Sequence, residues 1–193
     1  MYNGVLLNVS ARTTFGLTLQ GGLNSGKTVT DSCEVRSDLP ETTPTDPYCR
    51  NDPGFVTRVT GLASYSIPKI DVLFSGTFRS DQGVPLAANY VVSSAEAAKS
   101  LGRPLSGNAP SVTVNLIEPG VAWSDRVNAF DVRIAKVLRF GRVRTNIGVD
   151  IYNLLNSSAV LTNNAAFNPG GTWLVPTTVI TPRFAKINAS VDF

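Results

Sequence analysis

The sequence predicts an all-β fold, an antiparallel up-and-down meander of about seven to eight strands. Apolar and polar residues alternate with period two through most of the chain, which is the repeat of a strand with two different faces. The connections between these stretches are alternately very short and very long. Charged residues make up only 16% of the chain against a usual quarter, and hydrophobic residues make up 42%. These observations together favour one large sheet with an extended apolar face.

Three pairs of alternating stretches are expected to form hairpins. In the first pair, residues 4–12 and 15–26 are joined by Arg-Thr-Thr, a connection short enough for a hairpin. A Pro-Lys corner joins the second pair, residues 55–67 and 70–80. The third pair, residues 128–140 and 144–156, turns at Gly-Arg-Val. A last strand runs to the end of the chain, where every second residue is apolar or small.

Three long connections separate these hairpins, over residues 31–54, 80–126 and 157–181. The second should contain a short helix, with Ser93 or Ser94 as its N-cap and Gly102 near its C-cap. It has room for one short strand, Ser-Val-Thr-Val-Asn-Leu-Ile. We therefore expect the long connections to carry some local structure of their own.

The alternation assigns residues to the two faces of one continuous sheet. On the apolar face we expect Val5, Leu17, Leu19, Tyr65, Phe74, Phe78, Val132, Ile134, Val149 and Val191. On the polar face we expect Asn8, Gln20, Arg58, Asp71, Arg133, Asp150 and Asn188.

An outer-membrane β-barrel has this alternation, together with short periplasmic turns and long outer loops. The apolar rows would suit lipid, and the polar rows would suit a water-filled lumen. The lumen-facing charged residues would be Arg58, Asp71, Arg79, Asp131, Arg133 and Asp150. The same rows could belong to a soluble sheet packed on one face, but the rhythm of the connections favours a partial barrel.

Both cysteines, Cys33 and Cys49, lie in the first long connection, which is polar and rich in proline. Two cysteines that bracket such a stretch favour a disulfide, because a cross-link restricts the open loop. The alternative is a pair of free thiols in a cytosolic loop. The chain has no Cys-x-x-Cys and no histidine, so a zinc site is not expected.

No catalytic, metal-binding or cofactor-binding residue is predicted. The absence of histidine excludes triads that need one. Glu118 and Asp125 are interpreted as solvated loop charges rather than a carboxylate pair. Residues 21–28 match the letters of a phosphate loop, but an alternating strand precedes them and a β-branched stretch follows, so they are interpreted as a strand. Three arginines within residues 139–144 indicate a solvated corner, and no nucleic-acid partner is expected.

Residues 128–160 and the terminal Arg-Phe-Ala-Lys-Ile-Asn-Ala-Ser-Val-Asp-Phe resemble the last strands of TonB-dependent outer-membrane receptors of the Oar-like type. The family pattern at a strand end, D-[IV]-[YF]-N-L-x-N, is matched by Asp150, Ile151, Tyr152, Asn153, Leu154 and Asn156. The opening stretch and residues 23–33 look like preceding strands of the same barrels, so the resemblance covers nearly the whole chain, residues 1–193.

The resemblance implies a location in the outer membrane of a Gram-negative bacterium, with membrane lipid and the barrel-assembly machinery as partners. Phe193 would be the terminal aromatic of the assembly signal, with Val191, Ala189 and Ile187 behind it. Contact with the TonB complex would require a plug domain, which is not among these residues. We therefore expect a C-terminal portion of a receptor that takes up an iron chelate, cobalamin or an oligosaccharide, and that does not transport alone.

Two other classes of function are compatible with parts of the sequence. A soluble β-sandwich could bind a carbohydrate or a protein through loops that carry Trp123, Trp173 and Tyr90. An enzyme has in its favour only the phosphate-loop letters and scattered carboxylates. Residues 1–30 show no basic segment followed by an apolar one, so no secretory signal peptide is predicted there.

Overall fold

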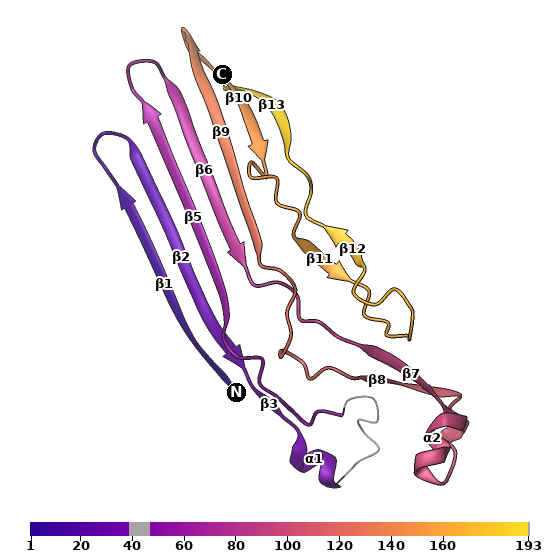
Figure 1. The fold of residues 1–193 in the computed structure, drawn as a ribbon. Helices are drawn as coiled ribbons and strands as arrows, with labels where there is room; N and C mark the ends of the chain where they lie inside the picture. Colours follow the sequence, from indigo (N-terminus) through magenta and orange to yellow (C-terminus); the bar gives the residue numbers. More distant parts are fainter. Residues whose placement is uncertain (39–46, 193) are drawn as a thin grey trace.

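Seven strands form one antiparallel sheet in the computed structural model, which describes residues 1–38 and 47–192. Their spatial order is β1-β2-β5-β6-β9-β10-β13, so consecutive strands of the sheet are neighbours (Figure 1). The strands are β1 (Tyr2–Arg12), β2 (Leu17–Thr28), β5 (Val56–Ile67), β6 (Val72–Asp81), β9 (Val127–Phe140), β10 (Val143–Tyr152) and β13 (Phe184–Asp192). The predicted meander is confirmed. The sheet is not closed, and β1 and β13 are its two edges within the described ranges.

The three short turns lie at one end of the sheet, together with the end of β13, and the long connections lie at the other end (Figure 1). The first turn is closed by Thr13, whose hydroxyl accepts a hydrogen bond from the Leu17 N–H at 3.0 Å. Gly16 and Gly141 have φ angles of 95° and 61°, which glycine adopts without the clash of a Cβ. Local residue chemistry therefore accounts for the first and third turns.

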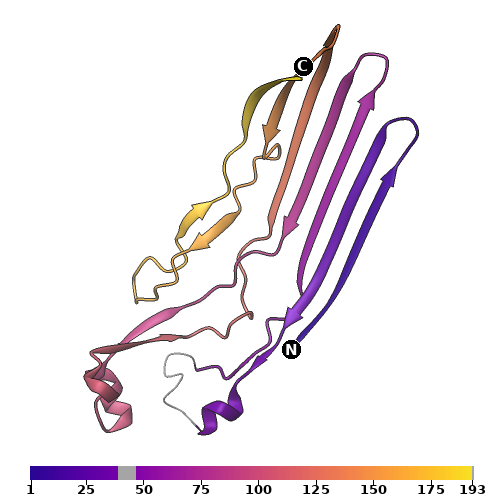
Figure 2. The ribbon, with the colours of Figure 1, turned by 180° about the vertical axis from the view of Figure 1, so that it is seen from behind.

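The long connections carry small elements of their own, seen from both sides of the molecule in Figures 1 and 2. The first contains β3 (Thr30–Asp31), α1 (Cys33–Asp38) and β4 (Arg50–Asn51). The second contains β7 (Asn89–Ser93), α2 (Ser94–Leu101), η2 (Ser106–Asn108) and β8 (Ser111–Asn115). The third contains β11 (Val160–Asn163) and β12 (Pro176–Val179).

The predicted helix in the second connection is confirmed with both of its caps. The Ser93 hydroxyl accepts a hydrogen bond from the Glu96 N–H at 3.2 Å, which satisfies one of the free donors of the first turn. Gly102 ends the helix with φ 68° and donates its N–H to the Ala98 carbonyl. The helix thus begins and ends where its local sequence predicts.

The rows of paired residues are staggered relative to the turns. Leu17, at the first turn, pairs with Tyr65, and the same row continues through Phe74 to Ile134. Ile134 lies six residues before Phe140, the last residue of β9. A shift of this kind means that the strands are tilted relative to the rows, which is the geometry that a sheet needs in order to curve into a barrel wall.

The sheet has almost no hydrophobic core. Within residues 1–38 and 47–192, the buried hydrophobic residues are Ala88, Val127 and Ala135, and no large side chain is fully buried. No other sheet in that part of the chain has more than two strands, so nothing of comparable size packs against either face. Backbone pairing therefore holds the sheet together far more than side-chain packing does. None of the described helices is long and apolar enough to cross a membrane.

Candidate functional site

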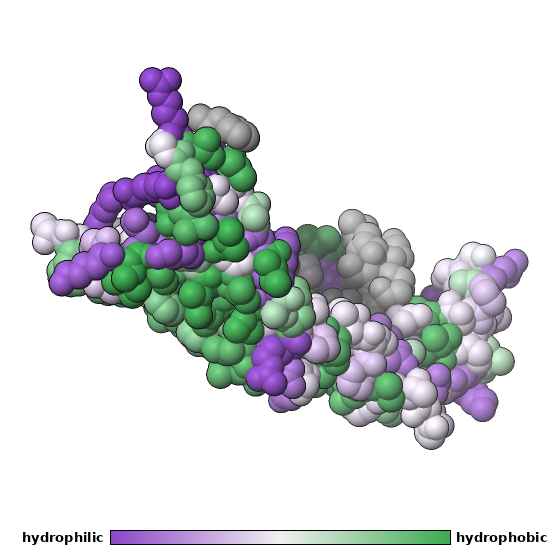
Figure 3. All heavy atoms as spheres, turned by 90° about the horizontal axis from the view of Figure 1, so that it is seen from above, coloured by the Kyte–Doolittle hydropathy of each residue, from purple (hydrophilic) through white to green (hydrophobic). Residues whose placement is uncertain are grey.

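The apolar face of the sheet is continuous across all seven strands. Directly paired residues share a face, and the pairing places all of the predicted apolar residues on the same side. They are Val5, Leu17, Leu19, Tyr65, Phe74, Phe78, Val132, Ile134, Val149 and Val191. Hydrophobic residues gather along one side of the sheet in a view from above (Figure 3). The predicted single apolar face is confirmed.

This face is uncovered. The exposed fraction reaches 78% for Ile187 and 64% for Val5, and many further large apolar side chains on the same face are exposed. Soluble monomers rarely expose contiguous apolar patches of more than a few hundred Å². On β5 the apolar row runs from Val59 to Ile67, which is about 27 Å at about 3.4 Å per residue. Because barrel strands are tilted, the height of this row along a barrel axis would be somewhat less than its length along the strand. It is therefore close to the apolar band of about 25 Å of an outer-membrane barrel.

Polar residues border the apolar face at both ends. At the turn end the Lys136 ammonium reaches back to the carbonyl of Ile70 in the second turn. The border at the loop end, called here the loop-end belt, is made of hydroxyl, amide and charged side chains. It consists of Ser25, Lys27, Thr57, Ser80, Gln82, Arg126 and Asn128.

The other face, the polar face, carries most of the charge of the sheet. Its pairing rows contain Asn8, Gln20, Arg58, Arg79, Asp131, Arg133, Asp150 and Asn188, as predicted. Basic strand residues of this face outnumber the acidic ones. The basic residues are Arg12, Arg58, Arg79, Arg133, Arg139, Arg144 and Lys186, and the acidic ones are Asp81, Asp131, Asp150 and Asp192. A trough of about 720 Å³ hollows this face between β1 and β9.

Asp71 departs from the prediction. It lies in the turn before β6, with φ 49°, and is not a strand residue of the polar face. The strand begins at Val72, because the turn takes up Pro68 to Asp71 instead of the two residues expected. The Asp71 carboxylate accepts a hydrogen bond from Arg139 at 3.0 Å, so the residue ties the second turn to β9.

Two charged clusters lie on the polar face. In the first, near the loop end, Asp81 binds two arginines, with Arg58 Nε at 2.5 Å and Arg79 Nε at 3.2 Å. All three side chains are partly exposed, so solvent screens their attraction. This cluster can hold strand neighbours in register and still present guanidinium groups to water.

The second cluster joins β9, β10 and β13. Asp150, with only 8% of its surface exposed, accepts a hydrogen bond from Asn188 at 2.6 Å and lies 3.6 Å from an Arg133 nitrogen. Arg133 donates in turn to Asn188 at 3.0 Å. Gly148 leaves the room for this contact, because a Cβ there would lie 3.2 Å from the Asn188 amide oxygen.

The end of β10 is organised by Asn153, which is 4% exposed and has φ 48°. Its N–H donates to the Asp131 carboxylate at 2.7 Å, which joins the end of β10 to β9. Its side chain donates to the carbonyls of Ser157 and Thr181 and accepts from the Ser157 N–H, each at 2.9 Å. Asn156 accepts from the Arg183 N–H at 3.0 Å. The asparagines of the resemblance motif thus join the end of β10 to the start of β13, a role that spacing alone did not predict.

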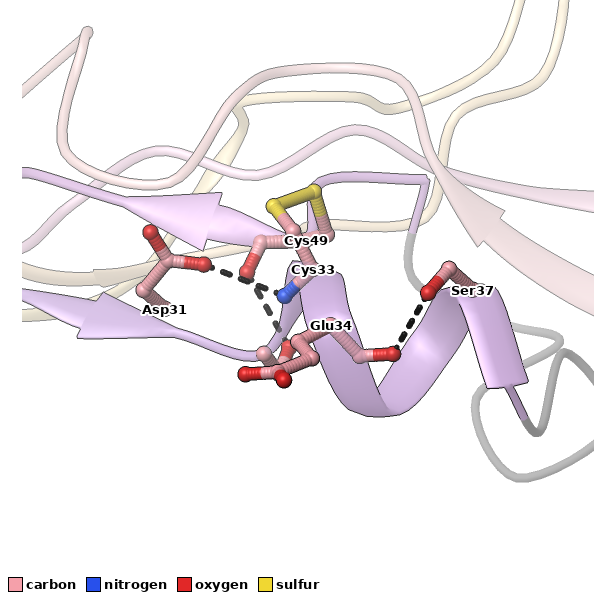
Figure 4. Close-up of a disulfide and its surroundings, with 6 residues drawn as sticks. Asp31, Cys33, Glu34, Ser37 and Cys49 are labelled. Atoms are coloured by element: carbon pink, nitrogen blue, oxygen red, sulfur yellow. Dashed lines mark hydrogen bonds between the residues drawn. A yellow bond between two sulfur atoms is a disulfide. The ribbon is translucent and has the colours of Figure 1, made fainter.

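Cys33 and Cys49 form a disulfide with their Cα atoms 4.7 Å apart (Figure 4). Asp31 caps the adjoining helix by accepting the Cys33 N–H at 3.1 Å, and Ser37 donates to the Glu34 carbonyl at 2.7 Å. The bond links α1 to the strand pair at the base of the first connection. The predicted pairing is present, and free thiols are not.

Contacts join the three long connections to one another. The Tyr48 hydroxyl donates to the Leu116 carbonyl at 2.9 Å, between the first and the second. Between the second and third, the Trp173 indole donates to Ala87 at 3.0 Å, and the Phe167 ring lies edge-on to both Tyr90 and Trp173. Tyr90 also donates to Glu96, and this hydrogen bond raises the pKa of the phenol. Trp173 and Tyr90 therefore hold loops together, whereas Trp123 bonds its own loop at Gly120.

Three residues predicted to belong to an assembly signal, Ile187, Ala189 and Val191, lie on the apolar face of β13. Phe193 lies outside the described residues.

Gly21 to Thr28 are part of β2, so the strand interpretation of the phosphate-loop letters is confirmed. Glu118 and Asp125 lie in the connection between β8 and β9. Within the described ranges there is no group of His, Cys, Asp and Glu that could hold a metal ion.

The chain was compared with family models, with curated proteins and with solved structures, and none of the three comparisons found a match.

Proposed function

We propose that the seven-stranded sheet is part of the wall of an outer-membrane β-barrel, with its apolar face against lipid and its polar face toward a water-filled lumen. The observation that carries the proposal is the difference between the faces: an uncovered apolar surface on one side of a single layer, and ion-paired charge on the other. A packed soluble domain would bury the apolar face. A bilayer covers it without a second protein layer.

Three further features support this assignment. The short turns share one end and the long connections the other, as in outer-membrane barrels. The stagger of the pairing rows suits tilted strands. Both charged residues on the strands of the apolar face lie toward its borders, Lys27 at the loop end and Lys136 toward the turn end.

We infer further that the barrel is that of a TonB-dependent receptor, which rests on the motif at Asp150–Asn156 and on the terminal strand. The open edges of β1 and β13 would pair with other strands of such a barrel, since an exposed edge is otherwise a site of aggregation. The sheet alone would then form a wall segment of an importer for a scarce nutrient and would not transport by itself.

The test uses the whole chain, oxidised so that Cys33 and Cys49 stay bonded, and refolded with phosphatidylcholine vesicles. One new cysteine is introduced and labelled with an environment-sensitive fluorophore, at Phe74 on the apolar face or at the adjacent Ser75 on the polar face. Brominated acyl chains should quench the label at position 74 strongly and that at position 75 weakly. Equal quenching at both positions would contradict the proposal and favour a soluble module.

The assembly role of the chain end has a separate test. Deletion of Phe193 from the exported protein should lower its abundance in isolated outer membranes and leave synthesis unchanged. Asp192→Asn, on the polar face, is the matched control and should have little effect. Normal assembly of the deletion variant would contradict the assembly-signal interpretation. The proposal that one face meets lipid and the other meets water would be unaffected.

A further inference from the structure

Arg126 stands out among the charged residues at the sheet, because four hydrogen bonds hold its guanidinium and no carboxylate of the described residues pairs with it. Nε donates to the Ser80 hydroxyl at 2.7 Å and Nη1 to the Gln82 side chain at 3.2 Å. Nη2 donates to the carbonyls of Thr57 and Ser80 at 2.8 and 3.1 Å. Among the ion pairs of the described residues none includes Arg126, and its neighbour Asp125 does not pair with it.

The guanidinium lies on the apolar side of the sheet. Ser80, which accepts its Nε hydrogen bond, shares a pairing row with Val59 and Asn128 on that face. Arg126 is therefore a rigidly held positive charge in the loop-end belt, at the border between the apolar face and the long connections. The other cation of the belt, Lys27, is already paired with Asp52 at 2.9 Å.

Further along the strands from the belt, the apolar face is hollowed. Gly21 and Gly61 pair directly, and their missing side chains leave a depression of about 390 Å³. Its lining is almost entirely apolar and includes Ala63, Phe78 and Phe130. About four residues, or roughly 14 Å along β6, separate the Arg126 row from the row of Phe78.

We propose that the loop-end belt around Arg126 binds the phosphate of an anionic membrane lipid, with one acyl chain lying in the hollow at Gly21 and Gly61. The inference rests on the proposed function, since it requires the apolar face to meet lipid. Four of the five guanidinium N–H donors already bind protein oxygens, so the positive charge and the one remaining N–H would meet the phosphate. A charge fixed in advance loses little freedom on binding. The apolar hollow on the same face favours a lipid over a free anion, because only a lipid has an acyl chain that could fill it.

The experiment measures lipid selectivity at the protein boundary. The oxidised chain is folded in phosphatidylcholine bilayers, and spin-labelled phosphatidylglycerol and phosphatidylcholine report their relative association by electron paramagnetic resonance. The wild type should prefer the anionic lipid. Arg126→Gln should lower that preference about fivefold, the effect expected for one basic residue near a membrane surface.

The matched control is Arg58→Gln, which removes the same charge at a similar distance from the loop end but on the polar face. It should leave the selectivity unchanged. Arg126→Lys keeps the positive charge and should retain part of the preference. That result would show that the loss in Arg126→Gln comes from the missing charge and not from a fold defect. Circular dichroism of each variant checks that the sheet forms.

The other outcomes overturn the proposal. Unchanged selectivity in Arg126→Gln, or equal losses in Arg126→Gln and Arg58→Gln, would exclude a specific site. Loss of selectivity in inorganic phosphate, compared with chloride at equal ionic strength, would show that the site takes a free anion. If the label at position 74 does not contact lipid, both the proposed function and this lipid site are wrong. If it contacts lipid but the wild type shows no preference for the anionic lipid, only the lipid site is wrong.

Discussion

The sheet and the long connections are stabilised in different ways. The sheet depends on backbone pairing and leaves its apolar face uncovered, with hardly any buried side chains. The connections have a disulfide, capped helices and side-chain hydrogen bonds that join one loop to the next. The stability of the sheet should therefore depend on what surrounds it, whereas the connections should remain ordered through their own cross-links. Four changes test this difference, from the largest expected effect to the smallest.

The largest effect is expected for a charge on the apolar face. Ile187→Lys should destabilise the chain folded in vesicles by about 2–4 kcal/mol, the cost of a basic residue near mid-membrane depth. Ser190→Lys, on the polar face of the same strand, should cost far less because that face meets water. Urea unfolding of both variants in vesicles gives the two free energies. Equal costs would contradict the assignment of the faces.

Removal of the disulfide should act on the connections. With a sequence separation of 16 between the cysteines, the cross-link is expected to stabilise by about 3 kcal/mol through the restricted unfolded chain. The Cys33→Ser, Cys49→Ser double variant should show faster amide exchange in α1 and at β3 and β4. Exchange in β5 and β9 should stay unchanged. Faster exchange throughout the sheet would mean that the two regions are not stabilised separately.

Asn153 is the point where the sheet and the third connection meet. Asn153→Ala removes three side-chain hydrogen bonds at a position with positive φ, so a loss of about 1–3 kcal/mol is expected. Asn156→Ala is the matched control, because it also has positive φ but accepts only one hydrogen bond through its side chain, from Arg183. Its smaller loss, measured by the same unfolding titration, would confirm that the network carries the effect.

The smallest effect is expected at the border between the two regions. The Lys27 ammonium, by its hydrogen bond, lowers the pKa of the Asp52 carboxyl below its ordinary value of 3.8. A lowered pKa means that the pair stabilises fully above that value and that this contribution is lost as the pH falls below it. Both groups are partly exposed, so the unfolding midpoint should barely move. Nuclear magnetic resonance titration should show the Asp52 pKa rising toward 3.8 in Lys27→Gln, and an unchanged pKa would contradict the pairing.

Much of this architecture could be predicted from short stretches of sequence. Alternation predicted the face of Val5, Phe74 and Val149 correctly, because backbone geometry makes successive side chains of a strand point to opposite sides. The caps of α2 and the Cys33–Cys49 pair also follow from local chemistry. Asp71 was assigned to the wrong element, because the length of the second turn depends on how the chain pairs on either side of it.

The sequence by itself determined the seven strands of the large sheet and the face that each of their residues takes, since these depend on neighbours in the chain. Only the tertiary structure decided that Asp150 meets Arg133 and Asn188, and that Asn153 closes the end of β10. It also decided that Arg126 is held on the apolar side by hydrogen bonds to protein oxygens, with no ion pair to any carboxylate in residues 1–38 and 47–192. These features depend on the register between strands far apart in sequence, where a shift of one residue would turn every side chain to the opposite face.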